Sequence, residues 1–92
     1  MIKSGDEREL DTAARKIIAA CGGRANISFV DSSISRLEIQ ILSNNLVDVA
    51  ALREAGAISV VLEKTMVQII VGETAQRLHY LLVQILQIVP AT

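Results

Sequence analysis

The sequence predicts an α+β fold: a two-layer sandwich in which three helices pack on one face of a four-stranded antiparallel sheet. Three observations lead to this prediction. Three segments repeat apolar residues with a helical period, four short segments resemble strands, and each pair of strands is joined by a short connection that favours a hairpin. The expected element order is α-β-β-α-β-β-α. One face of the sheet then stays open to solvent, and a partner would most naturally bind there.

The three helices are expected at residues 6–21, 48–55 and 74–89. The first has acidic residues in its first turn, where they complement the helix dipole, and it ends at two consecutive glycines, Gly22 and Gly23. The second begins after a capping Asp48 and ends at a glycine. The last has a broad apolar arc and is closed by a proline, which cannot continue a helix.

The four strands are expected at residues 27–30, 36–41, 58–62 and 67–71. The second strand alternates apolar and polar residues, which is typical of a sheet with one buried and one wet face. Residues 63–65 form a connection of hairpin length between the last two strands. The pattern therefore predicts two hairpins in one sheet.

Composition excludes several classes of function. The 92 residues make one domain, residues 1–92, whose ends at 1–5 and 90–92 are expected to be flexible. Nine basic against ten acidic residues and only two aromatics do not support nucleic-acid binding. A single cysteine excludes an internal disulfide and a cysteine-based zinc site. The apolar runs are too short to insert into a membrane, so a cytoplasmic location is expected.

One continuous stretch of sequence carries the strongest functional signal. Residues 22–37 read GGRANISFVDSSISRL. This stretch resembles the signature of the glucose-family enzyme IIB (EIIB) domains of the bacterial phosphoenolpyruvate-dependent sugar phosphotransferase system. That family has Gly-Gly, then Asn and an aliphatic residue, then Asp-x-Cys-x-Thr-Arg-Leu-Arg. The resemblance extends from about residue 17 to residue 72 and includes Val47–Asp48, Leu52, Gly56–Ala57 and Val67–Gly72.

The resemblance implies a phosphoryl relay. In the family a cysteine thiolate takes a phosphoryl group from a phosphohistidine of enzyme IIA and passes it to a sugar held in the membrane-embedded enzyme IIC. In this chain Asp31 matches the acidic residue before the cysteine, Arg36 the first arginine and Gln68 a glutamine of the last strand. Ser35 replaces the threonine and keeps a hydroxyl. The guanidinium of Arg36 is suited to bind two phosphate oxygens.

Two departures from the family pattern affect the chemistry. Ser33 occupies the cysteine position, and a serine hydroxyl is not ionised at neutral pH without a base beside it. Glu38 occupies the position of the second arginine and projects from the same strand face as Arg36, so we expect the two charges to neutralise each other in part. The sequence therefore predicts an EIIB-like domain that is unable to carry phosphate itself. It would be a docking, regulatory or inactive module.

Two alternatives remain at this stage. The chain is a phosphoryl-transferring EIIB whose cysteine was replaced by mutation, or it is an unrelated small α+β module that binds a protein. The resemblance implies enzyme IIA and enzyme IIC type domains, or a regulatory protein, as partners, and a possible tether to the inner membrane through a fused transporter domain. No cofactor or metal is expected. Cys21 is expected to be a buried, inert residue, and His79 to lie at a helix boundary without a catalytic or metal-binding role.

Overall fold

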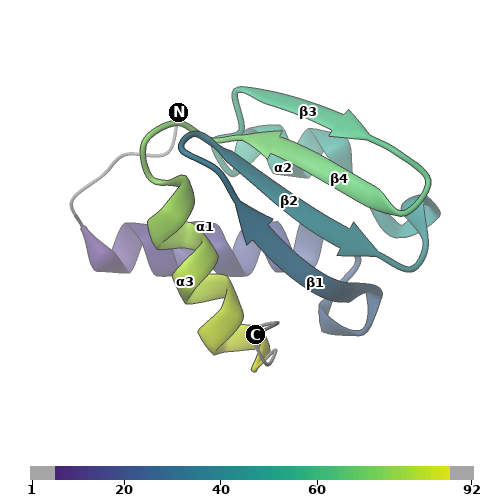
Figure 1. The fold of residues 1–92 in the computed structure, drawn as a ribbon, viewed down its shortest axis with the longest axis horizontal. Helices are drawn as coiled ribbons and strands as arrows, with labels where there is room; N and C mark the ends of the chain where they lie inside the picture. Colours follow the sequence, from purple (N-terminus) through teal and green to yellow (C-terminus); the bar gives the residue numbers. More distant parts are fainter. Residues whose placement is uncertain (1–5, 88–92) are drawn as a thin grey trace.

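The computed structural model describes residues 6–87, and the expectations for residues 1–5, for 90–92 and for the end of the last helix lie outside this range. The described chain contains three α-helices, four strands and two short 3₁₀ turns (Figure 1). In chain order these are α1 (Glu7–Ala20), η1 (Arg24–Asn26), β1 (Ile27–Ser32), β2 (Arg36–Ile41), η2 (Asn44–Leu46), α2 (Val49–Glu54), β3 (Ser59–Leu62), β4 (Met66–Ile70) and α3 (Ala75–Leu86).

Side-chain caps begin the first two helices. The sequence predicted the cap at Asp48, whereas at Asp6 it predicted only acidic residues at the start of a helix. The Asp6 carboxylate accepts a hydrogen bond from the backbone N–H of Arg8 at 2.8 Å, and Asp48 does the same for Ala51 at 3.0 Å. Each bond satisfies an N–H group that has no partner within its helix. At the other end of α1, Gly22 has a φ of 98°, and a Cβ there would lie 2.7 Å from the Cβ of Leu46. Only glycine fits this turn without displacing its neighbour.

The strands form one antiparallel sheet with the order β1-β2-β4-β3. β1 and β2 form one hairpin, β3 and β4 form the other, and β2 pairs with β4 in the middle of the sheet. The register of β1 shifts between Ile27 and Phe29. Strict alternation cannot place residues three apart on one face, so this bulge is what allows both Ile27 and Val30 to be buried.

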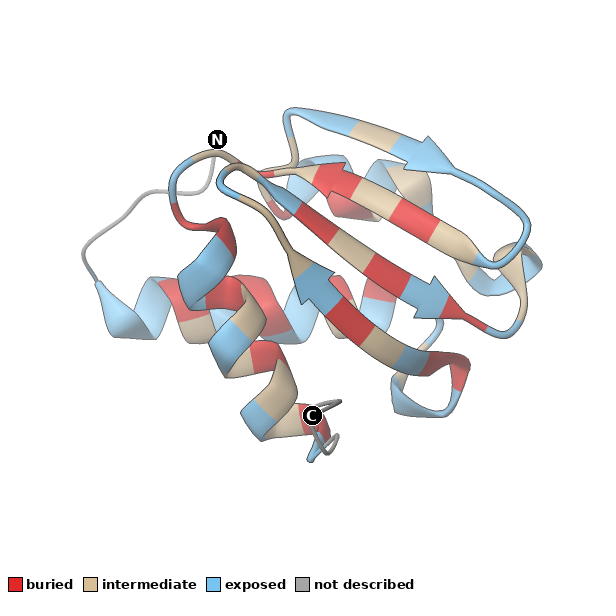
Figure 2. Cartoon of the chain, viewed as in Figure 1, coloured by how far each residue is buried: buried red, intermediate tan, exposed pale blue. Residues whose placement is uncertain are grey.

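The three helices lie on one side of the sheet, and the hydrophobic core fills the space between the two layers (Figures 1 and 2). The opposite face of the sheet carries no covering element among the described residues (Figure 1). This is the arrangement that the sequence predicted, and it is confirmed. The largest fully buried side chains include Leu10, Ile17, Leu37, Ile39, Leu52, Ile69, Leu78 and Leu82.

The boundaries differ in detail from those expected. β1 continues two residues beyond Val30, because Asp31 and Ser32 pair with Glu38 and Leu37 of β2. The two 3₁₀ turns were not predicted, since the sequence pattern there indicated only breaks between elements. The extension of β1 matters for function, because it places Asp31 and Ser32 inside the sheet rather than in a loop.

Candidate functional site

The connection between β1 and β2 is a tight hairpin whose position is fixed from two sides. The Ser33 N–H donates to the Arg36 carbonyl at 2.9 Å and closes the turn. The Ser35 carbonyl accepts hydrogen bonds from the backbone N–H groups of Val71, at 2.9 Å, and Gly72, at 3.1 Å. Ile34, at the tip, is 82% exposed. The structure therefore places Ser33 and Ser35 in a surface turn that leads into the sheet and is fastened to the end of β4.

Four of the predicted site residues lie together on the open face of the sheet. Asp31 is directly opposite Glu38, and Glu38 is directly opposite Gln68 on the other side of β2. Arg36 lies two residues before Glu38 and therefore on the same face. The hairpin turn with Ser33 and Ser35 lies at the end of this row. The structure thus brings the predicted residues into one region.

The Arg36 side chain is hydrogen-bonded to the neighbouring strand β4. Its Nη1 donates to Oε1 of Gln68 at 3.1 Å, and Nε2 of Gln68 donates to Oε1 of Glu63 at 2.9 Å. Among residues 6–87 the Glu38 carboxylate has no hydrogen bond or ion pair. Arg36 is therefore hydrogen-bonded to Gln68, and the expected partial neutralisation of its charge by Glu38 stays a prediction. A diagonal cross-strand neighbour is within reach of the long arginine side chain, and Gln68 occupies that position.

The Asp31 carboxylate is hydrogen-bonded to the backbone of the next residue in β1. Its Oδ1 accepts a hydrogen bond from the backbone N–H of Ser32 at 2.8 Å. Asp31 is exposed on the strand, and it faces another carboxylate across the ladder, that of Glu38. This arrangement orients the end of β1. The carboxylate makes its hydrogen bond to the backbone of Ser32, and among the described residues no hydrogen bond joins Asp31 to Ser33.

His79 lies near the site, a position that the sequence did not predict. Its Nδ1 lies 2.8 Å from the Oγ of Ser32, a hydrogen bond that joins α3 to the last residue of β1. Because side chains alternate along a strand, Ser32 points to the helical side while Asp31 points to the open face. The imidazole therefore contacts the neighbour of Ser33 rather than Ser33 itself. His79 is half-buried, as expected of a boundary residue, and it is hydrogen-bonded to the last residue of β1, next to the candidate site.

Cys21 cannot take the place of a reactive cysteine in this hairpin. It is fully buried at the end of α1, and burial raises the pKa of its thiol from 9.0 to about 12. The thiolate is the nucleophilic form, and it is not populated at neutral pH in such an environment. The prediction that Cys21 is an inert core residue is in agreement with this position.

Within the described part of the chain, no group of three or more His, Cys, Asp or Glu side chains is arranged to hold a metal ion. No helix there has the length and apolar character needed to cross a bilayer. The groups that lie together at the hairpin and the adjoining strands are the hydroxyls of Ser32, Ser33 and Ser35, the Arg36 guanidinium, the Gln68 amide, the His79 imidazole and the carboxylates of Asp31 and Glu38.

Comparison with known proteins gives this arrangement a class. No protein-family model matches the chain. It is 40% identical over 62 residues to the "PTS system N-acetylglucosamine-specific EIIB component" of Streptomyces coelicolor, an alignment that covers 67% of this chain and 80% of that protein. The chain therefore belongs to the EIIB domains of the bacterial sugar phosphotransferase system, in the glucose family that the motif predicted.

Two further relatives agree with this assignment. The chain is 38% identical over 74 residues to the "PTS system N-acetylglucosamine-specific EIICBA component" of Klebsiella pneumoniae, covering 79% of this chain and 11% of that longer protein. One domain of the phosphotransferase IIABC component from Clostridium difficile superimposes with a TM-score of 0.74 at 17% sequence identity. That superposition covers 87% of this chain and 84% of the solved one, and it confirms the fold. The alternative of an unrelated α+β module is excluded by the family membership.

Proposed function

We propose that this chain is an EIIB-like domain of a sugar phosphotransferase transporter that cannot carry phosphate itself, because Ser33 stands at the phosphocysteine position. It would act as a docking or regulatory module, or as an inactive appendage of the transporter. The observation that carries the proposal is the chemistry of the hairpin: its turn contains serines, and the one cysteine of the chain is buried with a pKa raised to about 12. No thiolate is available where the family mechanism needs one.

The charge of the open face supports the same conclusion. A phosphoryl group carries about two negative charges and is stabilised by cations and N–H donors. Here Glu38 stands opposite Asp31, and the Arg36 guanidinium is bound to the Gln68 amide. An incoming phosphoryl group would meet two carboxylates close to one arginine that is already engaged. Restoring the nucleophile alone would leave this unfavourable field in place.

The partners follow from the family. We infer that the module docks on enzyme IIA or enzyme IIC type domains, or on a regulatory protein, and that it works on the cytoplasmic side, with a possible tether through a fused transporter domain. We also infer that residues 1–92 make up one EIIB-like domain, since all elements from α1 to α3 share one core.

The test is a phosphorylation assay read out by intact mass and by site mapping. The chain is incubated with phosphoenolpyruvate, enzyme I, the histidine phosphocarrier and an enzyme IIA of the glucose family. We expect its mass to stay unchanged. A phosphoryl group mapped to Ser33 would refute the proposal.

Matched variants separate natural loss of the site from a simple replacement of the cysteine. If Ser33→Cys alone restores phosphoryl transfer, the chain is an ordinary EIIB domain whose cysteine was replaced. If Ser33→Cys fails and Ser33→Cys combined with Glu38→Arg succeeds, the whole site has lost its function. Ser33→Ala is the control for labelling elsewhere in the chain.

A further inference from the structure

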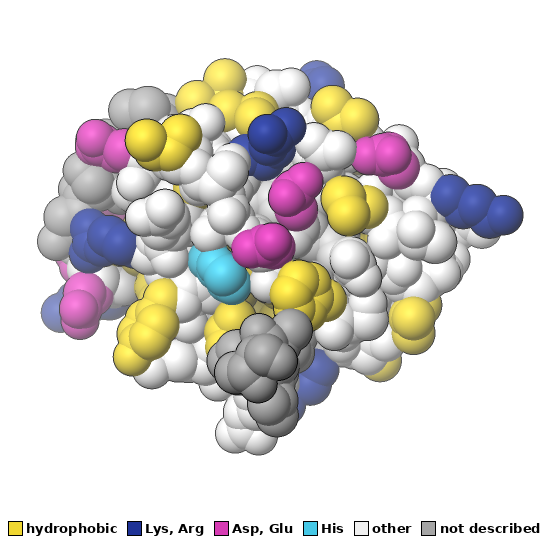
Figure 3. Space-filling model, in the orientation of Figure 1, with side chains coloured by type: hydrophobic (Ala, Val, Ile, Leu, Met, Phe, Trp, Pro, Cys, Tyr) yellow, Lys and Arg dark blue, Asp and Glu magenta, His cyan; other side chains and the backbone are white. Residues whose placement is uncertain are grey.

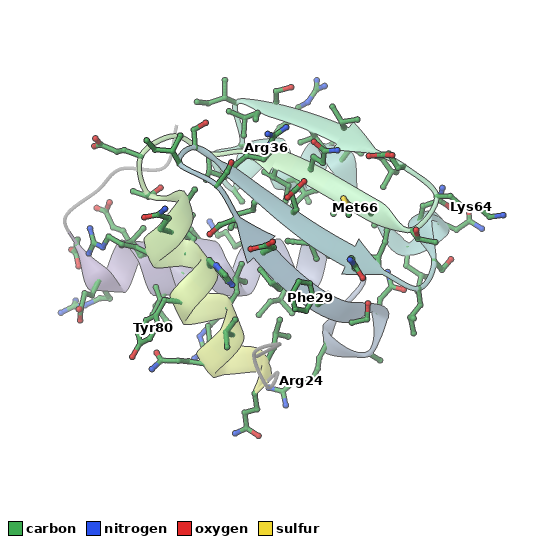
Figure 4. The ribbon with its side chains drawn as sticks, in the orientation of Figure 1. Arg24, Phe29, Arg36, Lys64, Met66 and Tyr80 are labelled. Atoms are coloured by element: carbon green, nitrogen blue, oxygen red, sulfur yellow. The ribbon has the colours of Figure 1, made fainter. Side chains whose placement is uncertain are left out.

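The open face of the sheet has the composition of a contact surface. By strand alternation and register its outward positions include Phe29, Met66, Val61 and Ile70, which are half-buried or exposed. Figure 4 shows Phe29 and Met66 on the strands of this face, which has no covering layer among the described residues. Phe29 and Met66 lie on either side of Gln40 in the ladder, so all three side chains project from the same face of the sheet. Exposed apolar side chains grouped on one face in this way are typical of a protein-binding surface.

The charges on this face have one dominant sign. Asp31 and Glu38 are directly opposite each other, and Glu63 reaches in from the β3–β4 turn to bind Gln68. Figure 3 looks onto this face and shows acidic side chains gathered in its middle, with hydrophobic side chains around them. Arg36 is the only basic residue in the four strands. Like charges directly opposite on one face repel each other, and among residues 6–87 neither Asp31 nor Glu38 takes part in an ion pair.

We propose that this open face docks a partner protein whose contact surface is apolar and carries lysine or arginine side chains; the proposal rests on the docking role proposed above. Contact with an apolar surface removes water from Asp31 and Glu38, and a carboxylate that loses water is stable only when it is paired. Cations of the partner would supply those pairs and relieve the repulsion between the two carboxylates. The face therefore favours a cationic partner over an acidic one.

Charge also argues against a second copy of this chain as the occupant. If two copies met through this face, each would bring Asp31, Glu38 and Glu63 into the interface, with Arg36 as the one basic residue of its four strands. An isologous interface brings the same patch from both sides, so the excess of acidic residues would be doubled and left mostly without cations. A nucleic acid or a free phosphate would meet the same repulsion.

The test uses two synthetic helical peptides, one of leucine and lysine and the other with glutamate in place of lysine. Each is titrated into the ¹⁵N-labelled full chain, and binding is mapped by NMR. We expect the lysine peptide to shift the amides of β1, β2 and β4 and to bind at least about tenfold more tightly than the glutamate peptide. The affinity should fall as the ionic strength rises from about 0.05 M to about 0.5 M, since the Debye length shortens about threefold.

Matched variants decide whether the carboxylates of this face are responsible. The double variant Asp31→Asn with Glu38→Gln should bind the lysine peptide about tenfold more weakly than the parent chain. The control, Glu9→Gln with Glu54→Gln, removes the same charge from exposed positions on α1 and α2 and should leave the affinity within about twofold. Three results would overturn the inference. They are an equal loss of affinity in both double variants, amide shifts confined to the helices, and equal affinities for the lysine and glutamate peptides. Phosphate found on Ser33 would instead refute the proposed function and leave this result standing.

Discussion

Asn26 offers a sharp test of how the start of β1 is fixed, because its buried side chain makes three hydrogen bonds. Its Nδ2 donates to the carbonyls of Cys21, at 2.7 Å, and Ser43, at 2.9 Å, and its Oδ1 accepts from the N–H of Ser43 at 2.9 Å. Asn26→Ala leaves all three backbone groups without these partners in a region from which water is largely excluded. At about 1 kcal/mol or more for each bond, the free energy of unfolding should fall by about 3–4 kcal/mol. That is a large fraction of the roughly 5–14 kcal/mol expected for a domain of this size.

Asn26→Asp separates hydrogen bonding from packing, because it keeps the shape of the side chain. An aspartate retains the acceptor for Ser43 but turns an anionic oxygen toward two carbonyl oxygens. At pH 7 this variant should be less stable than Asn26→Ala. The protonated acid can donate a hydrogen bond again, so the folded state raises the pKa of the new carboxyl. Stability should then recover as the pH falls through that raised pKa toward about 3.9, the value in the unfolded chain.

The assay is urea unfolding followed by far-ultraviolet circular dichroism at pH 7 and at pH 4.5. The difference in stability between Asn26→Asp and the parent chain should be smaller at the lower pH, whereas that of Asn26→Ala should change little. A free energy of unfolding for Asn26→Ala within about 1 kcal/mol of the parent value would contradict the proposed role of the three hydrogen bonds. An equal loss of stability for Asn26→Asp at both pH values would contradict it as well.

Three further predictions follow from the site. Ser32→Ala and His79→Leu should each lower the free energy of unfolding by about 1 kcal/mol, and a double-mutant cycle should give a coupling of similar size; a coupling of zero would mean that their hydrogen bond adds nothing. Glu38→Gln should raise the free energy of unfolding, measured with urea, by roughly 0.2–1 kcal/mol, and this gain should disappear when Asp31→Asn is already present. An unchanged gain in the Asp31→Asn variant would show that the two carboxylates do not repel each other. Cys21 should resist a thiol-specific disulfide reagent at pH 8 until the chain is unfolded, and fast labelling of the folded chain would contradict its burial.

The fold was predictable because its signals are local. Caps at Asp6 and Asp48, the glycines after α1, and apolar alternation in β2 each act within a few residues. The end of β1 was not predictable in this way. Asp31 and Ser32 are polar residues, and they belong to the strand only because β2 supplies their partners. Pairing across the sheet therefore overrode the local preference.

The site was predictable where it depends on strand alternation and on the family motif. Alternation placed Arg36 and Glu38 on one face, and the motif pointed to Gln68. The actual partner of Arg36 depends on the register between β2 and β4, which the sequence pattern alone does not determine. The contact between Ser32 and His79 joins residues 47 positions apart and depends on how α3 crosses the sheet. Its one available signal was that Ser32 shares a strand face with the buried Val30.

The geometry of the hairpin also explains why the fold does not depend on the side chain at position 33. The turn is closed by the Ser33 N–H and the Arg36 carbonyl, and it is fastened by the Ser35 carbonyl to the end of β4. All of these bonds are made by the backbone, so none of them requires a particular side chain at position 33. Ser33→Cys should therefore leave the stability of the domain nearly unchanged. If that variant gains phosphoryl transfer, the cause is then the new nucleophile and not a change in folding. If transfer appears only when Glu38→Arg is added, the cause is the changed charge.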